Sequence, residues 1–557
     1  MTLLLGPLLR RVVGDRATVW VETSAPATVM VRAGTGGGAA RTFTAFGRHY
    51  ALVVVDGLPA AAATPYQVLL DGAQVWPPPG YDRPVPVIRT RDDTAPVRLV
   101  FGSCREASPR AVRELPPDAL DSYSARLAGT GRDWPDLLLL LGDQVYADET
   151  SRATRRWLRR PGSPGPAPAE RAPRAQPDTE RPAGQVVDFT GYARLYHESW
   201  TDPDVRWLLS TVPSSMIFDD HEIIDDWNTS QRWRERMVAQ PWWRERITAG
   251  LASYWVYQHL GNLDPDELGA DPVYPAVVSA ADATGILREF GAAADDDRSR
   301  YRWSYALDVG RSRIVVLDNR CGRQVTPGQR AMLPDAQWEW LVRTVRGDGY
   351  DHLVLGSSLP WLMPFAVHHL EEAVSALAES PRRPVAAAAE SLRQVFDLEH
   401  WPAFGHSFDA LTALLGQLAT GAAGTAGAVP AVPAVPASIS VLSGDVHHSY
   451  VARADLAGAP IHQVTCSPVH NRVPLAMRAV FRAAWTGRVA RAGRALGRAA
   501  RVRPAPLTWT KLAGPYFGTA VGTLVHNGRS AHVLIEGTTP AGDLKVVARQ
   551  VLAASVQ

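Results

Sequence analysis

The chain has 557 residues, of which 46% are hydrophobic and 20% are charged. This balance is typical of a globular protein with a sizeable core, and it excludes a wholly disordered chain and a collagen-like or fibrous fold. The 58 basic residues nearly balance the 56 acidic ones, so the formal net charge is only +2. A global electrostatic attraction to nucleic acid or anionic lipid is therefore excluded, and any such attraction has to be local.

Cysteine usage and the N-terminal sequence both bear on the cellular compartment. Three cysteines are far too few for a disulfide scaffold of this length, which favours a reducing compartment. An arginine pair stands at residues 10 and 11, but Gly14, Asp15 and Arg16 interrupt the sequence after it, so no apolar core of a signal peptide follows. No run of about 18 or more apolar residues occurs, so we expect a cytoplasmic protein with no transmembrane segment.

The first part of the chain has the pattern of a β-sheet protein. Between residues 18 and 91, segments such as ATVWVET, ATVMVRA and TPYQVLLDG alternate apolar and polar residues and are separated by Gly, Pro and Asp turns. This alternation predicts a small all-β sandwich, of the fibronectin or immunoglobulin type, over residues 1–93.

After the proline-rich segment PPPGYDRPVPV, the pattern changes to short apolar runs without alternation. Such runs are typical of strands buried on both faces, which helices cover in α/β layers. Segments between them, such as RQVFDLEH at 393–400, have helical spacing, and the alternating C-terminal segments predict a β-meander. We therefore predict one α/β domain over residues 94–557. The runs are Val97–Phe101, Leu137–Leu141, Ile314–Leu317, Leu353–Leu355 and Ile439–Leu442.

Three segments of unusual composition interrupt this second domain. Residues 155–184 combine Pro, Gly and charge with almost no large apolar side chains, which predicts a disordered surface insertion. Residues 422–438 are rich in Ala and Pro, which predicts an extended spacer. Residues 471–503 hold nine arginines and no acidic residue, and their spacing predicts one or two basic amphipathic helices.

Side chains that commonly bind metals follow four of the strand-like segments directly. Each motif alone has a structural interpretation as a turn, a helix cap or a buried thiol. In an open α/β sheet, however, groups just past the carboxyl ends of several strands converge on one crevice. The four motifs together therefore predict a site. Its candidate residues are Cys104, Asp143, Tyr146, Asp219, Asp220, His221, Asp445 and His447.

This combination of donors fits a pair of close metal ions. Carboxylates and imidazoles suit divalent ions, and a phenolate or thiolate is used where a more oxidised iron is held. Asp143 and Tyr146 are three residues apart, so a helix after the strand would turn both toward one ion. Paired ions clamp the attacking and leaving oxygens of a displacement at phosphorus and lower the pKa of a bound water. No Ser or Thr stands in an activating setting, so we expect attack by a metal-bound hydroxide without a phosphoenzyme.

The ordered motifs resemble those of the PhoD-like alkaline phosphatases, in the calcineurin-like metallophosphoesterase superfamily. The resemblance covers most of the chain and implies a layered α/β fold, with β-sheets flanked by helices, after a small β-sandwich. It implies metal-dependent hydrolysis of phosphoric monoesters or diesters with two or more metal ions, namely iron plus calcium or another divalent ion. The matching motifs are Ser-Cys at 103–104, Gly-Asp-x-x-Tyr-Ala-Asp at 142–148, Asp-Asp-His-Glu at 219–222, Leu-Asp-x-Arg at 317–320 and Gly-Asp-x-His at 444–447.

The resemblance also implies a role for each metal ligand. Asp143 would bridge the two ions, and Cys104 and Tyr146 would bind the iron-like ion. Asp220 would bind the second ion. The remaining implied ligands are Asp219, Asp445 and His447. The Asp-x-His motif that usually comes first in the superfamily is replaced by Ser-Cys at 103–104, and no histidine stands near residues 355–358, where many relatives have a ligand.

Further implied roles concern the substrate. His221 would be the catalytic residue, outside the metal ligands, and would donate a proton to the leaving oxygen. Glu222 would orient His221 or the adjacent backbone. Arg320 is a candidate substrate-binding contact to phosphate, or else it forms an ion pair with Asp318.

Two other functions stay open from the sequence alone. A site that holds metal only for structure would make the protein an inactive metal-binding module, although such a site would not need His221. Alternatively, the arginine-rich segment 471–503 would bind nucleic acid or an anionic membrane surface, with a strong dependence on salt. A third interpretation is that this segment caps the mouth of the site and attracts an anionic substrate, since it closely follows the motif at 444–447.

Overall fold

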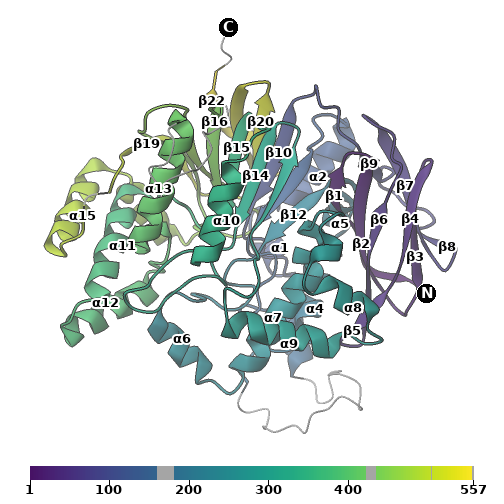
Figure 1. Ribbon diagram of the computed structural model, residues 1–557, viewed down its shortest axis with the longest axis horizontal. Coiled ribbons are helices and arrows are strands. Elements are labelled where there is room, and N and C mark those ends of the chain that lie inside the picture. The colour runs from purple at the N-terminus through teal and green to yellow at the C-terminus, as the bar shows by residue number, and fades with distance from the viewer. Residues whose placement is uncertain (160–180, 422–434, 504, 555–557) are drawn as a thin grey trace.

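The computed structural model describes residues 1–159, 181–421, 435–503 and 505–554 (Figure 1). In the predicted insertion, residues 160–180 lie outside the described part. Residues 155–158 belong to helix α3 (Arg152–Leu158), so the insertion begins later than its composition suggested. In the predicted spacer, residues 422–434 likewise lie outside the described part, and Ser438 already begins strand β16 (Ser438–Ser443).

The N-terminal part is an all-β sandwich, as predicted. Its two antiparallel sheets have the strand orders β1-β2-β6-β5 and β4-β3-β7-β8, and β9 pairs with β7. Valine side chains at positions 19, 21, 31, 53 and 68 fill the space between the sheets. The strands begin earlier than residue 18, because residues 3–13 pair with the second strand. The strands are β1 (Leu3–Val13), β2 (Arg16–Thr23), β3 (Thr28–Ala33), β4 (Gly36–Arg41), β5 (Phe43–Ala45), β6 (Arg48–Val55), β7 (Ala63–Leu70), β8 (Ala73–Trp76) and β9 (Val87–Arg89).

Two larger sheets form the rest of the structure. Their strand orders are β12-β11-β10-β20-β21-β22 and β13-β14-β15-β16-β18-β17-β19. The apolar runs of the sequence are the parallel strands of these sheets, and the C-terminal segments form the predicted meander. The remaining strands are β10 (Val97–Gly102), β11 (Leu137–Leu141), β12 (Ser214–Ile217), β13 (Tyr305–Val309), β14 (Ser312–Leu317), β15 (His352–Ser357), β17 (Ser449–Ala454), β18 (Ile461–Thr465), β19 (Trp509–Tyr516), β20 (Ala520–Asn527), β21 (Ser530–Thr538) and β22 (Leu544–Ala553).

The two larger sheets pack face to face, with helices outside. The close approach is visible at Gly356 on β15, where an added Cβ would lie 3.2 Å from a methyl group of Leu141 on β11. On the outer face of the second sheet, Leu353 and Leu355 pack with apolar residues of helices α10 and α13. The fold is thus the predicted layered α/β arrangement, with both faces of the parallel strands covered.

The helices that cover the sheets carry most of the predicted helical segments (Figure 1). One prediction was wrong in part: in RQVFDLEH the helix α12 ends at Val395, and the backbone turns at Asp397, which has φ +48°. The remaining helices are α1 (Ala111–Glu114), α2 (Ala119–Thr130), α4 (Phe189–Trp200), α5 (Pro203–Thr211), α6 (Gln231–Val238), α7 (Trp243–Tyr257), α8 (Tyr274–Ser279), α9 (Thr284–Asp296), α10 (Asp335–Val345), α11 (Phe365–Ala378), α12 (Arg383–Val395), α13 (Gly405–Thr420), α14 (Leu475–Ala484) and α15 (Gly487–Ala499), with short 3-10 turns η3 (His259–Asn262), η4 (Leu268–Ala270) and η5 (Trp401–Ala403).

Arg10, on β1, joins the sandwich to the larger sheets. Its guanidinium is fully buried and donates to the carbonyl oxygens of Ser214, Tyr257 and Gln258 at 2.7 to 3.2 Å and to the side chain of Asn262 at 3.0 Å. Burial lowers the pKa of Arg10 to about 10. Two of these carbonyls lie at the C-terminal end of α7, where the helix dipole favours a cation. Among the described residues, no helix is both long and apolar enough to span a membrane.

We expect Arg10→Ala to lower the free energy of unfolding by about 3 kcal/mol, because several buried acceptors lose their donor at once. Arg16→Ala is the matched control, since Arg16 lies on β2 and pairs with the exposed Asp266. Urea denaturation would measure both variants. Equal stability of Arg10→Ala and Arg16→Ala would contradict the role assigned to Arg10.

Candidate active site

The candidate residues from the four strand ends lie together in the structure. Apart from Tyr146, their donor atoms form three overlapping groups, each with all members within 4.8 Å of one another: Cys104 with Asp143 and His447, Asp143 with Asp220 and His221, and Asp219 with Asp220 and Asp445. Asp143 belongs to the first two groups and Asp220 to the last two. The donors thus form one continuous cluster at the carboxyl ends of β10, β11, β12 and β16.

The backbone of this cluster is held in an unusual conformation. Cys104, Asp143, Asp445 and His447 have φ of +59°, +51°, +64° and +51°, in the left-handed region that non-glycine residues rarely adopt. Such a residue costs on the order of 1 to 3 kcal/mol and persists only where its surroundings hold it in place, as they commonly do at functional sites. The fold therefore stores strain at the residues that turn donor atoms toward one point.

Glu222 links the backbone segments that directly follow β11 and β12. Its carboxylate accepts the backbone N–H groups of Asp143 at 3.1 Å, Gln144 at 2.7 Å and Asp219 at 2.9 Å. Gly142 allows the same close approach, because an added Cβ would lie 2.5 Å from the Cβ of Asp219. Of the two roles predicted for Glu222, the structure shows contacts with the adjacent backbone.

The cluster has a strong excess of negative charge. Burial raises the pKa of Asp143 well above its usual value, and Asp219 and Asp220 add to this against the opposing effect of His221. One carboxylate oxygen of Asp143 and one of Asp219 are buried without a hydrogen-bond partner. Buried acceptors of this kind are costly unless a cation or a donor meets them. The carboxylates therefore fit a site for cations.

The other donors have the chemistry of metal ligands. Burial, together with the charges of Asp143 and Asp445, raises the pKa of the Cys104 thiol well above its usual value. Burial and the charge of Asp143 likewise raise the pKa of the Tyr146 phenol well above its usual value. The phenol oxygen accepts a hydrogen bond from Asn471 at 3.1 Å. Burial lowers the pKa of His447 to about 4, which keeps its imidazole neutral. A neutral imidazole can bind a metal directly, and a cation would favour ionisation of the thiol and the phenol.

Comparison with known families agrees with this donor set. The family model of the PhoD-like phosphatases matches residues 119–496. The chain belongs to the PhoD-like phosphatase family. The resemblance expected from the motifs is thus confirmed, and the protein is a phosphoester hydrolase whose family implies metal ions and a phosphate ester substrate. A second model, a domain of unknown function (DUF7800), matches residues 1–88.

Solved structures support the fold. This PhoD-like phosphatase is similar to the structure described as PhoD, with a TM-score of 0.57 and 12% identity, over 98% of this chain and 88% of that one. The purple acid phosphatase PPD1 from yellow lupin (Lupinus luteus) seeds gives a TM-score of 0.46 at 11% identity, over 98% and 74% of the two chains. That second likeness is too low to carry an argument. No curated protein sequence matches the chain.

His221 lies beside the cluster and bonds to Asp148. Its Nδ1 bonds to the carboxylate of Asp148 at 2.9 Å, and its side chain is 17% exposed. Burial alone would lower the pKa of His221, but Asp148 and Asp220 outweigh it and raise the pKa well above the usual value. The raised pKa favours the protonated imidazole when the cluster holds no cation, and Nε2 lies 4.0 Å from the carboxylate of Asp225.

Arg320 is fully buried among carboxylates. Its guanidinium donates to Asp219, to Glu399 and, at 3.1 Å, to Asp445, and it lies 3.5 Å from Asp220. The alternative ion pair with Asp318 does not form, since that carboxylate accepts backbone N–H groups of residues 320–322. Arg320 therefore orders and partly neutralises the carboxylates, and its contact with a substrate phosphate stays a prediction.

Sequence reasoning missed one imidazole of the site. His400 bonds through Nε2 to Asp445 at 2.8 Å and through Nδ1 to Glu371 on α11 at 2.7 Å. Ser358 lies in the segment where many relatives have a histidine ligand, and its hydroxyl donates to Asp219 at 2.9 Å. His400 comes instead from the loop after α12. In the sequence, the only sign of this ligand is the acid next to the imidazole at 399–400, which the helical spacing of RQVFDLEH places in a helix.

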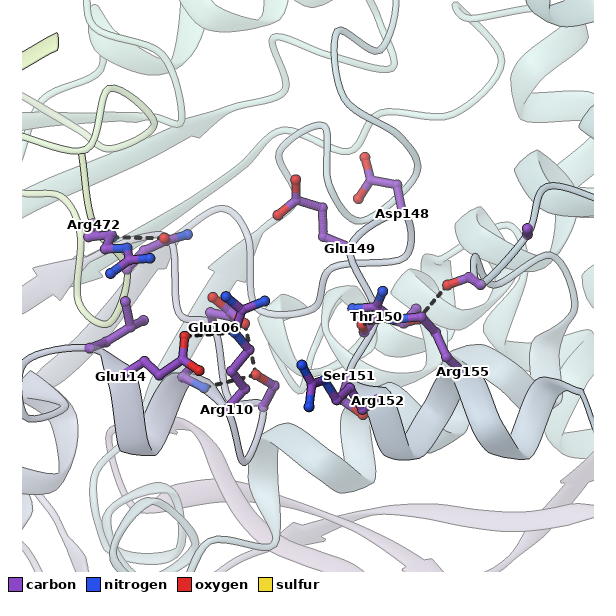
Figure 2. Close-up of a pocket in the computed structure, with 16 residues that line it drawn as sticks. Glu106, Arg110, Glu114, Asp148, Glu149, Thr150, Ser151, Arg152, Arg155 and Arg472 are labelled. Atoms are coloured by element: carbon purple, nitrogen blue, oxygen red, sulfur yellow. Dashed lines mark hydrogen bonds and ion pairs between the residues drawn. The ribbon is translucent and has the colours of Figure 1, made fainter. Parts of the chain in front are cut away.

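A cavity of about 410 Å³ is lined by residues next to the cluster but by none of its donor residues (Figure 2). Asp148 and Asn471, which bond to His221 and Tyr146, are among the residues that line it. Figure 2 shows Arg152 and Arg472 at the cavity as well, from α3 and from the beginning of the arginine-rich segment. The lining of the cavity is polar and carries side chains of both charges.

The arginine-rich segment forms two helices, α14 and α15, and α15 packs on α11. Four of its aliphatic side chains are exposed: Leu475, Val480, Val489 and Leu496. Binding of nucleic acid or of an anionic membrane by residues 471–503 stays a prediction.

Proposed function

We propose that this phosphatase hydrolyses phosphoric monoesters, diesters or both at a dinuclear metal centre. The observation that carries the proposal is the position of Asp143, whose carboxylate belongs to two neighbouring donor groups and has an unpartnered buried oxygen. A carboxylate shared in this way suits a bridge between two cations.

The two donor groups differ in chemistry, and we assign different ions to them. Cys104, Tyr146 and His447, together with Asp143, would hold an iron ion, because a thiolate and a phenolate favour the more oxidised metal. Asp143 and Asp220, with Asp219 and Asp445 beside Asp220, would hold calcium or another divalent ion. When bound, such ions lower the pKa of a water molecule and offset the charge that develops at phosphorus.

The protein's own groups supply proton transfer and orientation. His221 donates a proton to the leaving oxygen, and Asp148 holds the imidazole in the orientation that leaves Nε2 for this oxygen. The buried hydroxyls beside the donors are already engaged, since Ser358 donates to Asp219 and Ser467 donates to the sulfur of Cys104. Water therefore attacks phosphorus directly, without a covalent phosphoenzyme.

The proposal is tested by incubating the purified full chain with nitrophenyl phosphate and with bis-nitrophenyl phosphate. Iron and calcium are supplied singly and together, and nitrophenolate release is followed. We expect turnover of at least one ester, with the highest rate when both ions are present. Absence of turnover with every metal would favour the inactive metal-binding module.

The assignment of iron predicts a coloured protein. Charge donation from the Tyr146 phenolate and the Cys104 thiolate to a ferric ion gives a visible absorption band that calcium, magnesium or zinc cannot give. Tyr146→Phe is expected to shift or bleach this band without unfolding, because the ring still packs against His221 at a centroid distance of 4.7 Å. A colourless, fully active protein without iron would contradict the assignment.

A further inference from the structure

A second group of metal-ligand side chains lies on α11, apart from the catalytic cluster. His368, His369 and Glu372 occupy one turn of this helix, and their donor atoms all lie within 4.8 Å of one another. One oxygen of Glu372 is 3.5 Å from Nε2 of His368, and the other is 3.1 Å from Nδ1 of His369. The spacings of four and three residues turn both imidazoles toward the same carboxylate.

His368 is the informative member of this group. Its side chain has no exposed surface, and neither ring nitrogen makes a hydrogen bond. Phe408 and Trp509 enclose the ring, with centroid distances of 4.9 and 4.5 Å. A buried imidazole without hydrogen bonds is costly unless a further partner meets its nitrogen.

We propose that His368, His369 and Glu372 bind a divalent transition-metal ion, with zinc as the best match. Two imidazoles and one carboxylate form a common zinc ligand set, and a water molecule would complete the tetrahedron. Ligands about 2.0 to 2.1 Å from zinc at tetrahedral angles lie about 3.4 Å apart. The two observed contacts, at 3.5 and 3.1 Å, are close to that spacing, although each is made by a different oxygen of Glu372.

The charges around the group are compatible with a cation. Burial alone would raise the pKa of Glu372, but polar contacts with the two imidazoles and their charge when protonated lower it to about 2, so the carboxylate is ionised. Zinc would take the place of those protons on the imidazoles. Asp409 on α13 lies near enough to feel the charge of Glu372. Burial raises the pKa of Asp409, and the charge of Glu372 raises it further. Glu371, which precedes Glu372 in the chain, is also acidic, and its carboxylate accepts a hydrogen bond from His400.

An ion at this position would fix a helix on which the catalytic cluster depends. Glu371 on the same turn orients His400, which bonds to Asp445. On another side of α11, Gly493 of α15 lies so close that an added Cβ would be 3.0 Å from the Cβ of His369. The ion would therefore stabilise α11 where it meets both the active site and the arginine-rich helices. This site is independent of the function proposed above.

The test counts zinc in the full-length protein. The chain is stripped with a chelator, incubated with zinc chloride alone, passed over a desalting column and analysed by mass spectrometry for zinc per chain. We expect His369→Ala and Glu372→Gln each to hold one zinc fewer than the wild type. His532→Ala, on β21 and away from both clusters, serves as the control and should match the wild type.

Repeating the count in an Asp143→Asn background separates this site from the catalytic one, because Glu372→Gln should remove the same single zinc in both backgrounds. As a second readout, zinc should raise the melting temperature of the wild type by roughly 2 to 4 °C more than that of Glu372→Gln. Glu372→Gln preserves side-chain size, so it is the variant to use if His369→Ala does not fold. Equal zinc content and equal thermal shifts in the wild type and Glu372→Gln would overturn the proposal.

Discussion

Asp143→Asn is expected to abolish phosphoester hydrolysis and to lower metal occupancy at the catalytic cluster. The neutral amide is a poor bridge between two cations, and it also removes one negative charge from both donor groups that share this position. Metal content per chain and release of nitrophenolate would measure the two effects. Near-wild-type activity would refute the position of Asp143 at the centre of the site.

The same substitution is expected to stabilise the metal-free protein. Asp143 has a pKa raised well above its usual value, mainly by burial and further by neighbouring carboxylates. A raised pKa in the folded state means that the ionised carboxyl opposes folding, and this cost grows as the pH rises from the unfolded value of about 3.9 toward the folded one. Asparagine avoids that cost. At neutral pH, the chelator-treated variant should therefore melt at a higher temperature than the chelator-treated wild type.

Glu289→Gln is the control for Asp143→Asn. Glu289 lies on α9 and is exposed, and it belongs neither to a donor group nor to the lining of the cavity. We expect it to leave both activity and melting temperature close to wild type. A lower melting temperature for metal-free Asp143→Asn would show that the carboxylates repel one another less than the structure indicates.

The second large effect is expected for His221→Ala. Loss of a general acid slows hydrolysis by roughly 10² to 10⁴, and most for esters with poor leaving groups. Cys104, Tyr146 and His447 remain in place, so iron and its absorption band should persist. A comparison of nitrophenyl phosphate with an alkyl phosphate would show the dependence on the leaving group.

Asp148→Asn should give a smaller loss of activity, because the imidazole stays but loses its charged partner at 2.9 Å. Asp225→Asn is the control, since its side chain is 63% exposed and lies 4.0 Å from Nε2 of His221. If His221→Ala loses metal, His221 is a metal ligand and not the proton donor. Its donor atom lies within 4.8 Å of those of Asp143 and Asp220, so such a role fits the geometry.

The sequence allowed the strand ends to be predicted because their signals are local. Each apolar run is short, and Cys104 and Asp143 follow their runs almost at once, so strand and ligand could be identified together. Glu371 and His400 could not be found in this way. They come from a helix and from the loop after another helix, and only the packing of α11 beside η5 brings them together.

Neighbouring carboxylates show a second limit of prediction from sequence. Asp219 and Asp220 are adjacent in sequence and equal in chemistry, yet Asp219 is hydrogen-bonded by Arg320 and Ser358. Asp220 faces the group that contains Asp143 and His221. Arg320 lies against both carboxylates, but only Asp219 also accepts from Ser358 and only Asp220 shares a donor group with Asp143 and His221. The sequence holds no local signal that separates these two environments.

The buried guanidinium of Arg10 has a consequence for how the protein can be divided. Its acceptors are the backbone carbonyls of Ser214, Tyr257 and Gln258, which lie more than 200 residues away in the chain. A truncated chain beginning after the β-sandwich would leave these carbonyls without a donor on a newly exposed apolar surface. We therefore expect the phosphatase fold and its small N-terminal neighbour to unfold in one cooperative transition, and a chain cut at the boundary between the two family matches to be less stable.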